Sequence, residues 1–244
     1  LYTYDLDASP GRAVRRLTDT PASETDAKFS PGGRYVSFIR DANLHAIELS
    51  SGREIAITQG GGGPVSYGVA EFIAQEEMSR NTGNWWSPDE RYIAFTRVDE
   101  SAVAEIERFE VYADSLKVVK QRYPATGARN ADVQLYVTRI GRGPAVRVDL
   151  GANADIYLAR VQWLPDSRAI AVQRQSRDQK TLTLLKADAA SGATRKLLEE
   201  HSDTWVDVCD ELTFVSDRGD FLWGSSRSGF NHLYLHAADG QLQH

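Results

Sequence analysis

Two adjacent glutamates, Glu76 and Glu77, have the side chains and spacing that most clearly suggest chemistry in this sequence. They lie in the segment 68–80, where apolar residues recur at helical spacing, namely Val69, Phe72, Ile73 and Met78. Neighbouring side chains on a helix point about 100° apart, so the two carboxylates lie close together and repel each other. The pair therefore needs either open water or a bound cation. From this segment alone, a solvated charged turn and a cation-binding pair both remain open.

The other reactive side chains give no sign of a catalytic or metal site. The sequence Gly-x-Ser-x-Gly, which surrounds the nucleophile of many hydrolases, does not occur in the chain. The five histidines are not spaced as metal ligands, and Cys209 is predicted to be a small buried residue rather than a nucleophile. We therefore expect no catalytic residue, no metal and no cofactor in this sequence. Binding by Glu76 and Glu77 is the chemistry that remains.

Composition and charge narrow the classes of partner. The 244 residues carry a formal net charge of −6, with acidic and basic residues interspersed, and 41% of them are hydrophobic, as in an ordinary globular protein. No basic stripe is available to neutralise phosphates, which argues against nucleic acid as a partner. No apolar run approaches the ~20 residues that span a bilayer. A single cysteine cannot form an internal disulfide, so packing must stabilise the fold.

The elements that would position the glutamates are strands in a repeated unit. A strand, a Pro-containing turn and a second strand recur at 27–38, 85–95 and 161–172, with a weaker fourth copy from residue 211. Pro fixes φ, and Gly or Asp tolerates the tight corner. An aromatic residue precedes each of the three turns and is predicted to pack between neighbouring units: Phe29, Trp86 and Trp163.

These repeats predict an all-β fold, a β-propeller of four-stranded blades, because such sheets bury their faces by stacking around an axis. About four blades are expected, at approximately 20–62, 63–150, 151–200 and 201–244, as part of a larger ring. A β-sandwich is the alternative, but it would not repeat this turn. Two insertions interrupt the repeat. The first is a short helical insertion that carries Glu76 and Glu77. The second, 99–130, is predicted as a long excursion rather than a plain hairpin, which either pairs with a neighbour or folds back on its own blade.

Four stretches of the sequence resemble one known family. Residues 69–78, followed by Trp86-Ser87-Pro88, resemble the double-glutamate motif of the dipeptidyl peptidase IV family, prolyl oligopeptidase-type serine peptidases. Residues 122–130, 155–161 and 228–234 are similar to further stretches of that family and fall in the same order. The resemblance covers nearly all of the chain and is closest to bacterial members. It identifies residues 1–244 as a partial N-terminal β-propeller domain.

The resemblance implies an eight-bladed propeller that caps a C-terminal α/β-hydrolase domain, which is absent from this chain and carries a Ser-Asp-His triad. Such enzymes release X-Pro and X-Ala dipeptides from peptides with a free N-terminus. Glu76 and Glu77 match the two glutamates that bind the substrate ammonium group. The arm 99–130 resembles one that helps these enzymes form homodimers. The resemblance favours the periplasm or secretion and leaves the cytoplasm open.

One stretch departs from the family pattern, and two other functions remain open. After Trp205, where mammalian members offer an aromatic residue and an arginine to the substrate, this chain has Val208-Cys209-Asp210. The first alternative function is a non-catalytic propeller that serves as a scaffold for protein interactions. The second is another peptidase of the prolyl oligopeptidase clan, such as an endopeptidase or an acylaminoacyl peptidase.

Overall fold

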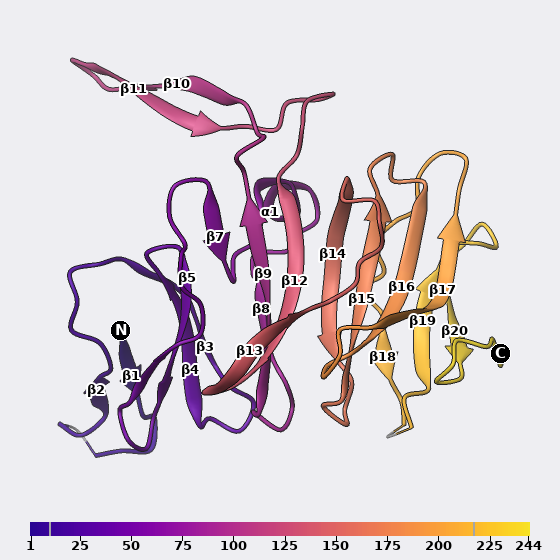
Figure 1. Cartoon of the computed structure of the whole chain (residues 1–244), viewed down its shortest axis with the longest axis horizontal. Helices are drawn as coiled ribbons and strands as arrows, with labels where there is room; N and C mark the ends of the chain where they lie inside the picture. Colours follow the sequence, from indigo (N-terminus) through magenta and orange to yellow (C-terminus); the bar gives the residue numbers. More distant parts are fainter. Residues whose placement is uncertain (10, 217) are drawn as a thin grey trace.

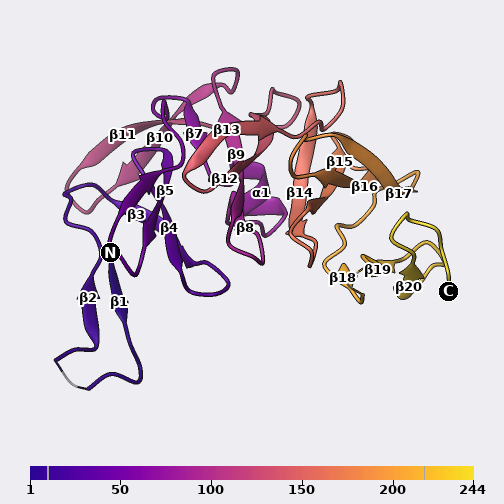
Figure 2. The ribbon, with the colours of Figure 1, turned by 60° about the horizontal axis from the view of Figure 1, so that its bottom comes forward.

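The repeated units fold into antiparallel sheets that follow one another along the chain. The computed structural model describes residues 1–9, 11–216 and 218–244. Four sheets of three or more strands stand side by side in chain order (Figure 1) and follow an arc (Figure 2). In the described residues the only helix is α1 (Phe72–Glu77), and none there is long and apolar enough to cross a membrane. The prediction of an all-β fold with a short helical insertion is confirmed.

Each of the four sheets is built mainly from strands that are consecutive in the sequence. The first has the order β3 (Glu24–Phe29), β4 (Tyr35–Arg40), β5 (Asn43–Glu48) and β6 (Glu54–Ala56). The second contains β7 (Val65–Tyr67), β8 (Asn84–Trp86), β9 (Tyr92–Asp99), β12 (Asp132–Arg139) and β13 (Arg142–Arg147). The third has β14 (Ile156–Trp163), β15 (Ala169–Ser176), β16 (Thr181–Asp188) and β17 (Thr194–His201). The fourth has β18 (Thr213–Phe214), β19 (Phe221–Ser225) and β20 (His232–His236).

The repeated turn closes in the same way in each of the first three sheets. In the first two copies the serine hydroxyl accepts a hydrogen bond from the backbone N–H of the tyrosine five residues later. Ser30 accepts from Tyr35 at 2.9 Å, and Ser87 accepts from Tyr92 at 3.0 Å. In the third copy Leu164 has no hydroxyl and keeps only the bond common to all three turns: the backbone N–H of Ser30, Ser87 or Leu164 donates to the carbonyl five residues later at 2.9 Å. Each copy of the turn is therefore stabilised by hydrogen bonds between residues close together in the sequence.

Aromatic side chains next to these turns join one sheet to the next. Trp86 stacks on Tyr35 of the preceding sheet with ring centroids 5.3 Å apart, and Trp163 packs against Tyr92 of the preceding sheet at 6.2 Å with the rings tilted by 31°. Trp86 and Trp163 are only 8% and 7% exposed, as predicted. The prediction was wrong for Phe29, which is 59% exposed. Among the described residues only a two-stranded hairpin precedes the first sheet, so no sheet stands before Phe29 as the first and second sheets stand before Trp86 and Trp163.

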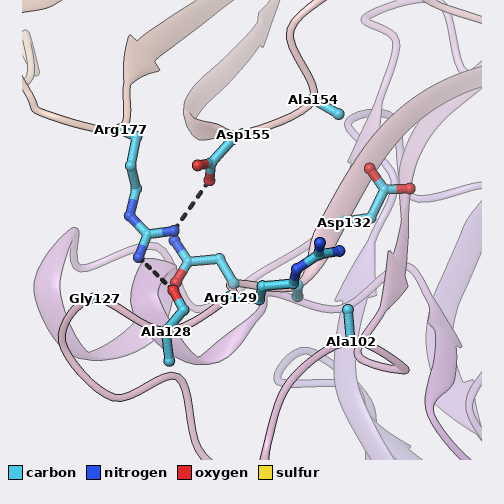
Figure 3. Close-up of a pocket in the computed structure, with 10 residues that line it drawn as sticks. Ala102, Gly127, Ala128, Arg129, Asp132, Ala154, Asp155 and Arg177 are labelled. Atoms are coloured by element: carbon cyan, nitrogen blue, oxygen red, sulfur yellow. Dashed lines mark hydrogen bonds and ion pairs between the residues drawn. The ribbon is translucent and has the colours of Figure 1, made fainter.

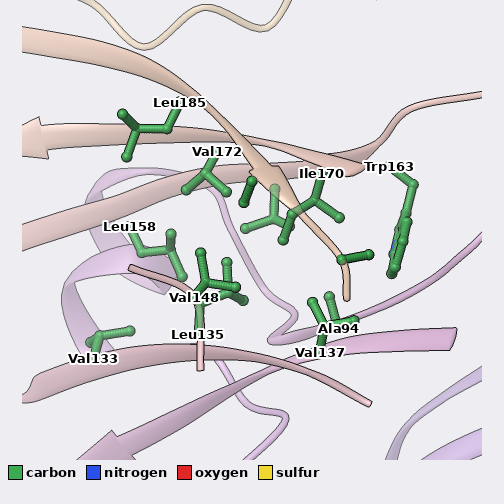
Figure 4. Close-up of a cluster of buried hydrophobic side chains, with 13 residues drawn as sticks. Ala94, Val133, Leu135, Val137, Val148, Leu158, Trp163, Ile170, Val172 and Leu185 are labelled. Atoms are coloured by element: carbon green, nitrogen blue, oxygen red, sulfur yellow. The ribbon is translucent and has the colours of Figure 1, made fainter. Parts of the chain in front are cut away.

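The hydrophobic core lies between adjacent sheets rather than within any one of them. Separate clusters of buried side chains fill the spaces between the first and second, second and third, and third and fourth sheets. Figure 4 shows the cluster between the second and third sheets, where Leu135 of β12 faces Leu158 of β14 and Ile170 of β15. Burying one such side chain stabilises the fold by about 1.5–3 kcal/mol, so each sheet depends on its neighbour.

The helical insertion arises where an edge strand of the second sheet is interrupted. Both β7 and β8 pair with the same edge of β9, and residues 68–83 loop out between them. Thr96 of β9 lies opposite the break. Its carbonyl accepts the N–H of Gly68 and its N–H bonds the carbonyl of Gly83, both at 2.8 Å, while its hydroxyl donates to the carbonyl of Val69 at 2.6 Å. A Cβ on Gly83 would lie 2.1 Å from that Val69 oxygen, so the chain requires glycine there.

Two hairpins lie outside the four sheets. One joins β1 (Tyr2–Tyr4) to β2 (Val14–Arg16), and the other joins β10 (Glu105–Val111) to β11 (Leu116–Arg122). The second hairpin projects away from the sheets (Figure 1). Segment 99–130 is thus an excursion, as predicted, but the expectation that it would not be a plain hairpin was wrong. Its seven consecutive antiparallel pairs, from Glu105 with Arg122 to Val111 with Leu116, form a regular ladder.

Candidate functional site

The last turn of α1 presents both glutamates to solvent. Glu76 and Glu77 are exposed, whereas Ala74 on the same helix is fully buried. Neither carboxylate forms an ion pair or a side-chain hydrogen bond with any residue that the structure describes. Two adjacent carboxylates without a cationic partner repel each other and remain available for a charged ligand.

The end of the helix is held against the third sheet. Met78, the residue after Glu77, is 7% exposed and packs in a buried cluster with Tyr157 and Ala159 of β14. On the other side of the helix, Phe72 meets Tyr123 at the root of the projecting hairpin, with ring centroids 5.2 Å apart. The apolar face predicted for this segment is therefore real. These contacts anchor the helix on two sides and leave Glu76 and Glu77 exposed in its last turn.

A buried ion pair connects the two ends of the helical segment. Glu71 precedes α1 and Arg80 follows it, and their side chains are 6% and 3% exposed. Arg80 donates to the Glu71 carboxylate, to the carbonyl of Leu158 on β14 at 3.0 Å, and to the carbonyl of Thr82 at 2.8 Å. This pair was not predicted from the sequence. The available signal was a glutamate and an arginine flanking the apolar helix.

A hollow of about 450 Å³ opens beside Glu77, between α1, β14 and the segment that follows β17. Its walls combine apolar and polar side chains, including Ile73, Met78, Tyr157, Arg160, Trp205 and Asp210. Arg160 Nε lies 2.7 Å from Asp210 Oδ1, so these two charges neutralise each other. Glu77 lines the hollow, and Glu76 is the residue next to it on the same exposed turn. The unbalanced charge at this edge is therefore negative.

Two buried glutamine side chains of β15 fix the wall that contains Val208-Cys209-Asp210. Gln173 accepts the N–H of Cys209 at 3.1 Å and donates to its carbonyl at 2.6 Å, and Gln175 donates to the carbonyl of Val206 at 2.6 Å. Burial raises the pKa of the Cys209 thiol to about 11, so it remains protonated at neutral pH and is a poor nucleophile. This agrees with its prediction as a small buried residue.

A second hollow, of about 640 Å³, lies at the root of the projecting hairpin (Figure 3). Arg177 crosses it, 3.0 Å from the carboxylate of Asp155 and 2.8 Å from the carbonyl of Ala128. Its lining includes parts of two stretches that resemble the family, residues 127–130 and Asp155, but neither Glu76 nor Glu77. No group of three His, Cys, Asp or Glu side chains in the described part of the chain could hold a metal ion.

Comparison with known proteins agrees with the resemblance of the motifs. The sequence matches the family "Dipeptidyl peptidase IV (DPP IV) N-terminal region" over residues 1–244. It is 29% identical to "Probable dipeptidyl-aminopeptidase B" of Phaeosphaeria nodorum over 96% of this chain and 28% of that protein. It is 24% identical to "Probable dipeptidyl peptidase 4" of Trichophyton verrucosum over 97% of this chain and 33% of that protein.

The fold also matches the solved structure of a protein that is named as a dipeptidyl peptidase. The crystal structure of Porphyromonas gingivalis dipeptidyl peptidase 4 superimposes with a TM-score of 0.87 and 27% identity, over 95% of this chain and 33% of that one. The predicted β-propeller fold is confirmed by this match, and the number of blades stays a prediction. The chain thus spans about a third or less of the length of these relatives. It belongs to the dipeptidyl peptidase IV N-terminal region family.

Proposed function

We propose that this chain is the substrate-recognition part of a dipeptidyl peptidase IV-like serine exopeptidase that releases N-terminal X-Pro and X-Ala dipeptides. Glu76 and Glu77 bind the ammonium group of the substrate. The four sheets are blades 20–62, 63–150, 151–200 and 201–244 of an eight-bladed ring. A C-terminal α/β-hydrolase domain of the full-length protein supplies the nucleophile. The observation that carries the proposal is the exposed carboxylate pair beside the hollow.

The charge at this edge suits a free amino terminus. An ammonium group offers three N–H donors and one positive charge, and it relieves the repulsion between the two carboxylates. An acylated terminus offers one neutral N–H and leaves that repulsion in place. Two charge-assisted hydrogen bonds, weakened because both carboxylates are exposed, favour the free terminus by about 100-fold. Such a site selects exopeptidase substrates.

The hollow beside Glu77 accommodates the residue that carries the ammonium group. Its apolar walls, Tyr157, Met78 and Trp205, suit a short aliphatic side chain, and Trp205 is 62% exposed and free to cover it. The Arg160–Asp210 pair at its edge is charge-balanced. The hollow therefore adds contact area without opposing the ammonium group.

The test is the turnover of Gly-Pro p-nitroanilide by the full-length protein, with and without the double substitution Glu76→Gln and Glu77→Gln. We expect kcat/KM to fall by about 100-fold or more, mostly through KM. Glu107→Gln is the matched control, because Glu107 is an exposed strand glutamate on the projecting hairpin. Turnover equal to that of the wild type in the double variant would refute the role of the pair. Equal cleavage of blocked and free peptides would instead indicate another peptidase of the clan.

A further inference from the structure

We propose that the buried Glu71–Arg80 ion pair is the positioning device for the double-glutamate helix, a role that rests on the proposed function of Glu76 and Glu77. The pair contacts no substrate. It fixes where the last turn of α1 stands relative to β14, and so where the two carboxylates meet an ammonium group. Glu71 and Arg80 are therefore positioning residues rather than catalytic ones.

The helix needs such a device because it cannot hold its own shape. It has six residues, and Glu71 at its N-cap makes no side-chain capping hydrogen bond. Helices this short are unstable in isolation. Instead, the Glu71 carboxylate receives the Arg80 guanidinium, so the residue before the helix is joined to the third residue after Glu77. The ion pair thus closes the segment that contains both glutamates.

The same guanidinium ties the closed segment to its surroundings at three points. Nε donates to the carbonyl of Leu158 in the third sheet at 3.0 Å, and Nη1 donates to the carbonyl of Thr82 in the returning chain at 2.8 Å. The guanidinium carbon also lies 5.9 Å from the centre of the Trp85 ring. A planar group with donors in fixed directions can serve all these acceptors together, whereas the single ammonium of a lysine cannot.

Because both side chains are buried, each charge depends on the other. With side chains 6% and 3% exposed, neither partner can lose the other without leaving a buried charge unpaired. The helix would then have to shift to admit water. Displacing a binding group by about 1 Å can cost about 100-fold in rate, which is enough to remove most of the preference for a free amino terminus.

The test uses the full-length protein carrying Arg80→Gln, Arg80→Lys or Glu71→Gln, with the folded sites counted by titration with a serine-directed fluorophosphonate. We expect KM for Gly-Pro p-nitroanilide to rise at least about tenfold in both glutamine variants, while kcat per titrated site changes by less than about threefold. The KM of Arg80→Lys should lie between the KM of the glutamine variants and that of the wild type. A residue that only stabilised the fold would lower the number of titrated sites and leave KM unchanged.

Arg177→Gln is the matched control, because Arg177 also pairs with a carboxylate and bonds a carbonyl, but its side chain and that of Asp155 are 29% and 60% exposed. Its KM should equal that of the wild type. If the glutamine variants do not fold, Arg80→Lys decides: a wild-type KM overturns the proposal. A wild-type KM in Arg80→Gln and Glu71→Gln, with a raised KM in the Glu76/Glu77 double variant, overturns the positioning role alone. A wild-type KM in that double variant overturns the proposed function as well.

Discussion

Glu90 links the turns of two adjacent sheets through hydrogen bonds. We expect the stability that this link contributes to depend on pH. Glu90 occupies the left-handed position of the second repeated turn, with φ of 58°, and its side chain reaches back to the first turn. Glu90 Oε1 accepts hydrogen bonds from the hydroxyl of Ser30, from the N–H of Gly32 at 2.9 Å and from the N–H of Arg34 at 3.1 Å. One carboxylate thus satisfies three donors of the neighbouring sheet.

These contacts set how much stability the protein loses when the charge of Glu90 is removed. Hydrogen bonds to a charged group contribute about 1.5–3 kcal/mol each, but Gly32 and Arg34 are exposed, so water would replace much of what is lost. Glu90→Gln keeps the acceptor oxygen and removes only the charge. We therefore expect it to lower the free energy of unfolding by about 1–2 kcal/mol at pH 7, which is about 2–8 °C in Tm for a domain of this size.

The pH dependence has a definite sign. Burial by itself would raise the pKa of Glu90, but the hydrogen bonds from Ser30, Arg34 and Gly32 outweigh it and lower the pKa below 4.5. A lowered carboxyl pKa contributes stability that is fully present above pH 4.5 and is lost as pH falls through the pKa of the folded state. The difference between wild type and Glu90→Gln should therefore be constant from pH 7 to about pH 5 and should shrink below pH 4.5.

The assay is urea unfolding followed by tryptophan fluorescence at pH 7, 5 and 3.5, with Glu107→Gln as the control. The control should match the wild type at all three values, because Glu107 is exposed on the hairpin. A Glu90→Gln difference that is absent at pH 7, or that persists unchanged at pH 3.5, would refute the reasoning.

Two further predictions concern the projecting hairpin and the buried thiol. Leu116 and its neighbours leave the hairpin with a largely apolar, exposed surface, which we propose as part of a homodimer contact. Leu116→Asp should therefore convert a dimer of the full-length protein to monomer in light scattering, while Lys117→Asp, exposed on the other face of the same strand, should not. An unchanged mass for Leu116→Asp would contradict the contact. Because burial raises the pKa of Cys209 to about 11, iodoacetamide at pH 8 should label it at least about tenfold more slowly in the folded protein than in urea, and equal rates would show that it is accessible.

Local patterns in the sequence were sufficient to predict the strands and the turns between them. The Ser-Pro turns at Ser30 and Ser87 use hydrogen bonds within five residues, so each turn is specified where it stands. Trp86 and Trp163 were correctly predicted to pack between neighbouring sheets, because a large apolar residue beside a tight turn needs a surface to pack against. The same argument was wrong for Phe29, since burial depends on what lies on the far side of the first sheet.

The placement of the candidate site could be predicted only in part. Glu76 and Glu77 were visible as a charged pair on a short helix, and their role stays a prediction. The interruption of the edge strand opposite Thr96 was not visible, because it depends on contacts between residues 27 positions apart in the sequence, such as Val69 and Thr96. Nor could the sequence join Arg80 to Leu158, which lies 78 residues away. Long-range contacts of this kind carry no local pattern.

The binding of a free ammonium group by Glu76 and Glu77 is tested most directly by one measurement. In the full-length protein, kcat/KM is compared for Gly-Pro p-nitroanilide and for the analogue in which a hydroxyl replaces the amino group. We predict that the wild type prefers the free amine by about 100-fold, and that Glu76→Gln with Glu77→Gln reduces this ratio nearly to one. A double variant that retains the full preference for the free amine would contradict the account.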